Sequence, residues 1–349
     1  MHTDPLGAHH RGILEEITRL KSRAEAFTLC LVVHSTGSTY RKSGALTVVR
    51  ADGTRRGVIS GGCLEPELES AARAALAEHR PRVILFDTRS DDDVVFGSGT
   101  GCRGQMQVML VPVGAGTAHP LCEALLSAER GQQLLKAALV TSGEHVGGGF
   151  LWTANVETVL PPSVDGARGL RGRAPGEYPL ANGSTCAVVV FAPSPVVMFI
   201  GAGPEAPALI NIANQLGWRV IISDHREGLL SAHGAGAERA ICARPAAAFA
   251  ALGDRRLDAC IVMTHGAASD REALAALARR TDPFIGLLGP PARRDELLAE
   301  LDPTARATLT PRLHAPVGIK LGGYGPETLA LSICAELQRF LAAESQLRG

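Results

Sequence analysis

Apolar residues in this chain follow either a helical or an extended spacing, which predicts an α/β protein. Near the N-terminus, apolar residues from Ile13 to Ala24 recur at helical spacing and predict an amphipathic helix over residues 9–26. Runs rich in Val, Ile and Leu then predict short buried strands, with a helix before the fourth. The predicted strands span residues 28–34, 45–50, 56–60, 83–87 and 105–112, and the helix spans residues 68–79.

From residue 195 onwards the pattern changes to strand, glycine turn, helix and strand. The first strand covers residues 196–200, the helix residues 208–216 and the second strand residues 219–224. Two more apolar runs, at 259–263 and 283–288, continue the alternation. This order is typical of a dinucleotide-binding fold, so the sequence predicts a Rossmann-like, doubly wound parallel sheet.

The middle of the chain gives weaker signals. Residues 161–179 are rich in Pro, Gly and Arg, which indicates loops and a linker. The sequence therefore predicts an α/β domain at 1–113, an extension and linker at 114–194, and a Rossmann-like domain at 195–349.

Composition excludes some classes of partner. The chain has 35 basic and 35 acidic residues, which argues against nucleic acid or an anionic membrane as the main partner. The N-terminus has no signal-peptide pattern, and no apolar run is long enough to span a bilayer. Eight cysteines are spread through the chain, which favours reduced thiols in the cytoplasm.

Two glycine turns carry a cysteine each. Gly61 and Gly62 precede Cys63, and an acid, a proline and a second acid follow as the first turn of a predicted helix. Gly101 precedes Cys102 in the second turn. Each cysteine could be a buried, unreactive residue of a tight turn, or the two could line a shared thiol site. Their spacing is too long for a local zinc knuckle, so a metal site requires that the fold bring the turns together.

Arg41 lies in a polar, turn-rich loop beside a lysine. One interpretation is a solvated loop. The other is a contact to an anion or to the edge of a pterin, because a guanidinium offers a planar fork of donors.

The Rossmann-like segment suggests a nucleotide site. Gly201 would make the turn, Gly203 would admit a phosphate close to the backbone, and Asp224 would meet a ribose hydroxyl. Arg226 could instead favour another phosphate-bearing ligand. His265 follows a strand at the carboxyl edge of the sheet, where it is either an acid–base or ligand candidate or a structural residue.

Taken together, these motifs resemble the XdhC/CoxI family of molybdenum-cofactor maturation factors, in the family's order along the chain. The matching segments are Gly37–Arg41, Gly44–Ala45, Ile59–Glu65, Gly101–Gly104, Gly201–Gly203, Asp224–Arg226, Thr264–His265, Phe284–Gly289, His314–Gly318 and Pro326–Glu327.

The resemblance implies a cytoplasmic, non-catalytic chaperone, expected to be a homodimer. Such a protein binds the molybdenum cofactor (molybdopterin, in a plain or nucleotide-bearing form) and protects it during sulfuration by a cysteine desulfurase. It then delivers the cofactor to a xanthine dehydrogenase-like molybdenum hydroxylase. By position, Cys63 and Cys102 would face the cofactor or its labile sulfur.

The chain departs from the family pattern at Arg103, Gly266, Lys320 and Pro290-Pro291, and most of these positions lie at the ligand edge of the Rossmann-like half. Two other functions stay open. One is an NAD(P)-dependent oxidoreductase that uses the glycine turn and Asp224, with His265 as acid or base. The other is a thiol redox or sulfur-transfer protein in which Cys63 and Cys102 react.

Overall fold

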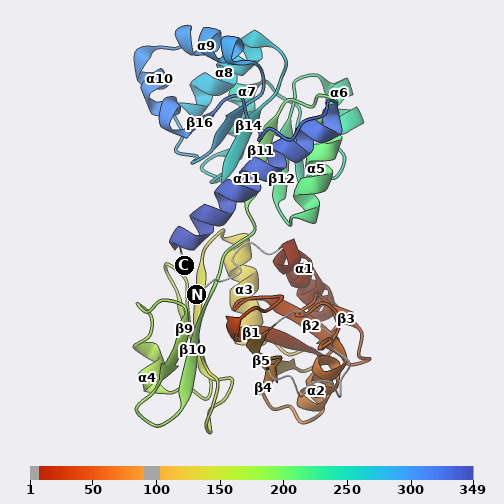
Figure 1. Cartoon of the computed structure of the whole chain (residues 1–349), viewed down its shortest axis with the longest axis vertical. Helices are drawn as coiled ribbons and strands as arrows, with labels where there is room; N and C mark the ends of the chain where they lie inside the picture. The colour runs from red at the N-terminus through yellow and green to blue at the C-terminus, as the bar shows by residue number, and fades with distance from the viewer. Residues whose placement is uncertain (1–7, 90–102, 349) are drawn as a thin grey trace. The chain divides into compact units, whose positions relative to one another are not determined.

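The computed structural model describes residues 8–89 and 103–348. The chain divides into a first compact unit that ends at Ser194 and a second that runs from Pro195 to Glu344 (Figure 1). None of the helices in the described part of the chain is long and apolar enough to cross a membrane.

The first unit begins with an antiparallel sheet of five strands, in the order β3-β2-β1-β5-β4. Its elements are α1 (Ala8–Ser22), β1 (Phe27–Gly37), β2 (Leu46–Arg50), β3 (Arg55–Arg56), α2 (Glu65–Ala77), β4 (Arg82–Asp87) and β5 (Gly104–Val113). The sequence predicts a longer strand at 56–60, but β3 ends at Arg56. Gly57 follows it with a φ of +100°, outside the range of an extended strand.

Residues 114–194 form a second five-stranded sheet, in the order β8-β7-β6-β10-β9, where the sequence predicts an extension and a linker. Its elements are α3 (Pro120–Arg130), β6 (Leu135–Val140), β7 (Gly149–Trp152), β8 (Glu157–Leu160), α4 (Asp165–Arg168), β9 (Gly176–Pro179) and β10 (Thr185–Phe191). One apolar core contains Leu29 and Met109 of the first sheet together with Leu139 and Val189 of the second. Three of these strands have only four residues, too few to show a clear period in the sequence.

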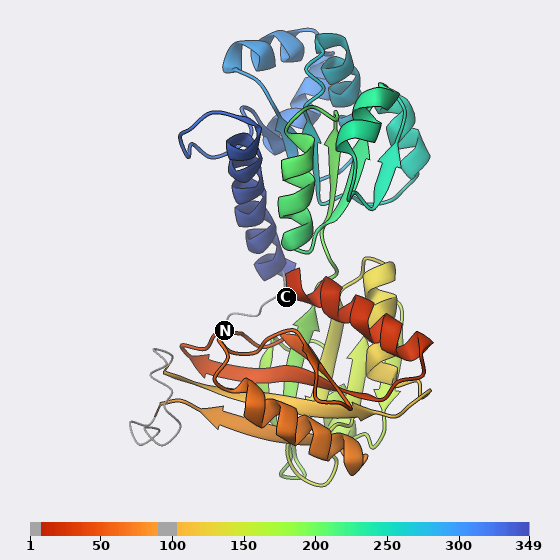
Figure 2. The ribbon, with the colours of Figure 1, turned by 90° about the vertical axis from the view of Figure 1, so that its right-hand side faces the viewer.

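The second unit confirms the predicted doubly wound parallel sheet. Its strand order is β13-β12-β11-β14-β15-β16, the Rossmann order, and helices cover both faces (Figure 2). The elements are β11 (Val196–Ile200), α5 (Ala206–Gln215), β12 (Arg219–Ser223), α6 (Glu227–His233), β13 (Arg239–Ile241), α7 (Pro245–Leu252), β14 (Ala259–Val262), α8 (Ala267–Leu277), β15 (Ile285–Leu287), α9 (Pro291–Ala299), α10 (Pro303–Leu309), β16 (Leu313–His314) and α11 (Pro326–Arg348).

Candidate functional sites

The Cys63 turn is a short connection that leads into α2. The helix begins at Glu65 with Pro66 in its first turn, as the sequence predicts. Cys63 precedes the helix by two residues, and its thiol is exposed, with Sγ 3.7 Å from Ser60 Oγ. The interpretation of Cys63 as a buried residue is therefore wrong, while its reactivity stays a prediction.

Glu65 holds this turn together by accepting hydrogen bonds from it. Its carboxylate is buried and accepts hydrogen bonds from the backbone N–H of Ser60 at 2.9 Å and of Gly62 at 3.1 Å, and from the Ser60 hydroxyl. Burial alone would raise the pKa of Glu65, but the hydrogen bonds from Ser60 outweigh it and hold the pKa below the ordinary value. From the sequence, Glu65 is predicted only as a favourable charge at a helix N-terminus. Its hydrogen bonds to the preceding turn were not predicted.

A cavity of about 190 Å³ opens beside the turn. Its lining includes Cys63 and Gly61 of the turn and the exposed Tyr40. The remaining lining residues are apolar or carry hydroxyl groups, apart from one glycine: Ser38, Thr39, Ile59, Ser60, Leu64, Phe86, Thr88, Gly104 and Met106. Among the described residues, none that lines the cavity carries a formal charge. Over the part of its lining that the structure describes, the cavity is thus uncharged and has one accessible thiol.

Thr88, directly after β4, and Gly104, the first residue of β5, also line this cavity. The Thr88 hydroxyl donates to the Gly104 carbonyl at 3.0 Å, and the Gly104 N–H donates back to the Thr88 oxygen at 3.2 Å. A Cβ at position 104 would lie 2.6 Å from the Thr36 carbonyl and 2.7 Å from that of Ser38, so the packing requires glycine. The predicted site residues Gly101 and Cys102 lie outside the described residues.

Arg41 is buried in the loop after β1 and does not line the cavity. Its backbone carbonyl accepts a hydrogen bond from the Thr39 hydroxyl at 2.8 Å, which ties it to a residue that does line the cavity. The contact of Arg41 to a pterin edge stays a prediction. Gly62, also predicted to bind the cofactor, supports the turn through its N–H.

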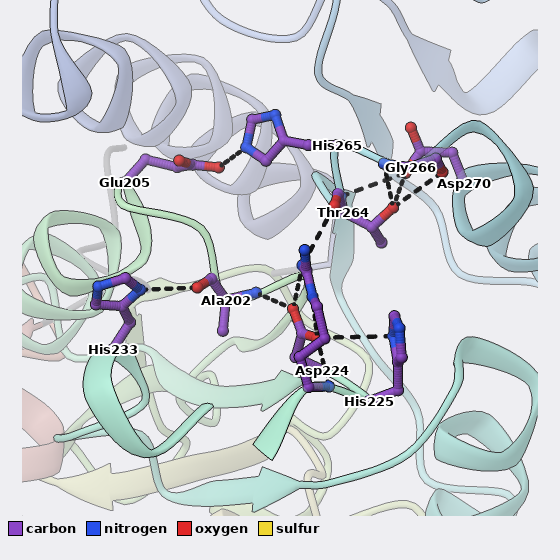
Figure 3. A network of polar contacts seen from close by, with 10 residues as sticks. Ala202, Glu205, Asp224, His225, His233, Thr264, His265, Gly266 and Asp270 are labelled. Atoms are coloured by element: carbon purple, nitrogen blue, oxygen red, sulfur yellow. Dashed lines mark hydrogen bonds and ion pairs between the residues drawn. The ribbon is translucent and has the colours of Figure 1, made fainter. Parts of the chain in front are cut away.

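In the second unit, the predicted nucleotide residues gather at the carboxyl edge of the sheet (Figure 3). Gly201 has a φ of +115°, and a Cβ there would lie 2.3 Å from the Met263 carbonyl, so only glycine fits where β11 and β14 end. Gly201 thus makes the turn that the sequence predicts.

Asp224 points into the protein at this edge. Its carboxylate accepts hydrogen bonds from the N–H of Ala202 at 2.8 Å and from the Arg226 guanidinium at 2.7 and 2.9 Å. Burial alone would raise the pKa of Asp224, but Arg226 and the Ala202 N–H outweigh it and lower the pKa to about 2. Arg226 is in turn committed to Asp224 and to the Thr264 carbonyl, 3.3 Å away.

Two side chains cover Gly203, and the sequence analysis named only one of them. Glu205, directly before α5, is buried, and one of its carboxylate oxygens lies 2.9 Å from His265 Nε2. A Cβ on Gly203 would meet both groups within 3 Å. An acid at the end of a glycine turn was the signal that could have identified Glu205.

The backbone around His265 is held by a second polar group. His265 has a φ of +60°, a conformation uncommon for residues other than glycine. The Thr264 hydroxyl donates to Asp270 at 2.6 Å (Figure 3). Arg293 pairs with the same carboxylate at 2.5 Å. Among the residues that the structure describes, no group of three or more His, Cys, Asp or Glu side chains is placed to hold a metal ion.

Comparison with known proteins gives matches over both units. The model of the XdhC and CoxI family matches residues 20–87, and that of the XdhC Rossmann domain matches residues 197–337. A relative from Bacillus subtilis (strain 168), whose name describes a probable xanthine dehydrogenase subunit, is 28% identical over 320 residues, covering 91% of this chain and 94% of the relative. The uncharacterized protein YqeB of Escherichia coli (strain K12) is 25% identical over 328 residues, 93% of this chain but only 45% of that protein.

A solved structure also resembles the whole chain. It is described as the crystal structure of a xanthine dehydrogenase from Bacillus halodurans, and it aligns with a TM-score of 0.79 and 28% identity. The alignment covers 95% of this chain and 96% of the other.

Proposed function

Because the chain belongs to the XdhC and CoxI family, we propose that it is a maturation factor for a xanthine dehydrogenase-like molybdenum hydroxylase. In this proposal the protein binds the molybdenum cofactor, protects it during sulfuration by a cysteine desulfurase and inserts it into the client enzyme. Its role is that of a chaperone and not of a catalyst.

The observation that carries the proposal is the exposed Cys63 thiol in a cavity whose described lining residues are uncharged. A thiolate is a soft ligand and suits a soft metal–sulfur centre. Apolar walls with several hydroxyl groups suit a flat heterocycle that also forms hydrogen bonds. The residues therefore fit the cofactor, which would supply the molybdenum–sulfur centre when bound.

The volume of the cavity limits what it could hold. Pockets for drug-sized ligands have roughly 300–1,000 Å³, and this cavity has about 190 Å³. We propose that it receives one end of the cofactor, the metal–sulfur centre with the adjoining edge of the pterin ring, and that Cys102 contributes a second thiol. Gly104, two residues after Cys102, lines the cavity.

The test is an anaerobic titration of the full chain with molybdenum cofactor. Bound molybdenum is measured by mass spectrometry after gel filtration, and thiol reactivity is measured in parallel. We expect near-stoichiometric binding that protects Cys63 from alkylation, and much weaker binding by Cys63→Ala and Cys102→Ala. Cys242→Ala is the matched control, because Cys242 is also exposed but belongs to the second unit and lies outside the cavity.

Binding that survives both cavity substitutions would move the cofactor away from this site. Failure of the wild type to bind the cofactor at all would contradict the proposal. Persulfide on Cys63 without any bound cofactor would support the sulfur-transfer function instead.

Three further parts of the proposal rest on the family alone. They are a cytoplasmic location, a homodimer and a direct contact with the desulfurase. Light scattering of the purified chain tests the dimer, and co-purification with the desulfurase tests the contact.

A further inference from the structure

The turn before α5 is covered by a carboxylate of the protein itself. A Cβ built on Gly203 would lie 2.7 and 2.8 Å from the two Glu205 oxygens and 2.9 Å from His265 Nε2. The Glu205 side chain is only 3% exposed. In dinucleotide-binding Rossmann folds, the second glycine lets a pyrophosphate approach the backbone at this position. Here an anionic side chain takes that space.

The Glu205 carboxylate is already an anion at this edge of the sheet, and the charges around it are unfavourable for a bound pyrophosphate. Asp224 is paired with Arg226 and Asp270 with Arg293, so both arginines of the network are already committed. Glu205 is engaged by His265, whose Nε2 lies 2.9 Å from one of its carboxylate oxygens. A pyrophosphate at Gly203 would meet the Glu205 carboxylate at close range, where like charges repel.

The backbone holds His265 in contact with Glu205. Its left-handed backbone is fixed on both sides, because the Thr264 hydroxyl bonds to Asp270 and the Gly266 N–H donates to that hydroxyl oxygen at 3.1 Å. Uncommon backbone conformations of this kind persist where the surroundings determine them. The His265 side chain is half exposed, whereas the Glu205 side chain that it contacts is buried (Figure 3).

We infer that Glu205 is a specificity-determining residue that closes the phosphate position of the second unit to dinucleotides, with His265 as its positioning partner. The inference goes beyond the proposed function, since it concerns the second unit and not the Cys63 cavity. It also removes the main support for a nicotinamide-dependent oxidoreductase, because Gly203 and Asp224 are both occupied by the protein's own groups.

The experiment compares the full chain with Glu205→Ser and Glu205→Gln, titrated calorimetrically with ADP and with NADH in phosphate-free buffer. Serine is a favourable residue before a helix, so the first variant removes the carboxylate and keeps the fold. We expect no saturation of the wild type at millimolar ligand. Glu205→Ser should bind both ligands at least about tenfold more tightly, and Glu205→Gln should gain less, because it loses the charge but keeps the bulk.

Two further variants test whether the gain in binding comes from removing the Glu205 carboxylate itself. Glu296→Gln removes the same charge from an exposed position on α9 and should leave binding at the wild-type level. His265→Asn keeps a residue that tolerates the left-handed backbone but loses the contact that positions Glu205, so it should bind more tightly than the wild type and less tightly than Glu205→Ser, which also lacks the carboxylate. Submillimolar binding of ADP or NADH by the wild type would overturn the inference. So would a folded Glu205→Ser variant that binds no better than the wild type.

Discussion

Replacing Glu65 by alanine tests whether one buried carboxylate holds the Cys63 turn. Glu65 is 2% exposed and accepts the N–H and the hydroxyl of Ser60, which is itself buried. Alanine would leave those donors without their acceptor, and an unsatisfied buried group costs about 1–3 kcal/mol. Water can reach the N–H of exposed Gly62, which limits the loss there. We therefore expect the free energy of unfolding of the first unit to fall by about 2–3 kcal/mol.

The two tryptophans allow the unfolding of each unit to be measured separately. Trp152 lies in the first unit and Trp218 in the second, and both are buried. In a Trp218→Phe background, urea unfolding followed by Trp152 fluorescence reports the first unit alone. Glu67→Ala is the matched control, since Glu67 is exposed in the same helical turn and should change stability by less than about 0.5 kcal/mol.

The pH dependence gives the prediction a second test. The pKa of Glu65 is lowered in the folded protein, so its contribution is complete above the pKa of the unfolded chain, about 4.3, and is lost as pH falls through the folded value. The stability difference between the wild type and Glu65→Gln should therefore be larger at pH 7 than at about pH 3. Equal stability of wild type, Glu65→Ala and Glu65→Gln at pH 7 would refute the reasoning.

Two more predictions concern the second unit. Asp224→Asn should lower its stability at pH 7 by about 1–3 kcal/mol, because the Arg226 fork loses its charged partner. Since the pKa of Asp224 is lowered to about 2, the difference should close between about pH 4 and pH 2, as read from Trp218 fluorescence. Gly201→Ala should prevent stable folding of this unit, because its Cβ would lie 2.3 Å from the Met263 carbonyl. Gly228→Ala in α6 meets no atom within 4 Å and should be neutral or stabilising in the same thermal unfolding assay.

The fold of the second unit could be predicted well from the sequence, because its order of strands and helices is compatible with few chain topologies. A strand, a glycine turn, a helix and a parallel strand can pack in few ways, and the connection is right-handed. The second sheet of the first unit was not predicted, and one of its apolar faces belongs to a core that it shares with the first sheet. Leu139 and Val189 belong to that shared core, and neither lies in a segment whose own pattern identifies its partner.

The candidate sites show a different limit. The sequence located Cys63 correctly at the start of a helix, since Pro66 and the flanking acids are local signals. It could not show that Glu65 turns back to bind Ser60 and Gly62, because that depends on the path of the turn. An acidic residue at the start of a helix thus predicts a favourable interaction with the helix dipole, but not which hydrogen-bond donors its carboxylate contacts.

The glycine turn of the second unit shows why a motif does not fix a ligand. Gly201, Gly203 and Asp224 have the spacing of a dinucleotide site, and the fold around them is the one that this spacing predicts. Two neighbours change the chemistry. Arg226 takes the carboxylate that a ribose would use, and Glu205 takes the space that a phosphate would use. Both residues can be recognised in the sequence: Arg226 is a basic residue two positions after Asp224, and Glu205 is an acidic residue at the end of the glycine turn. A charge opposite to that of the ligand supports the nucleotide interpretation of a glycine turn, whereas an acid within the turn argues against it.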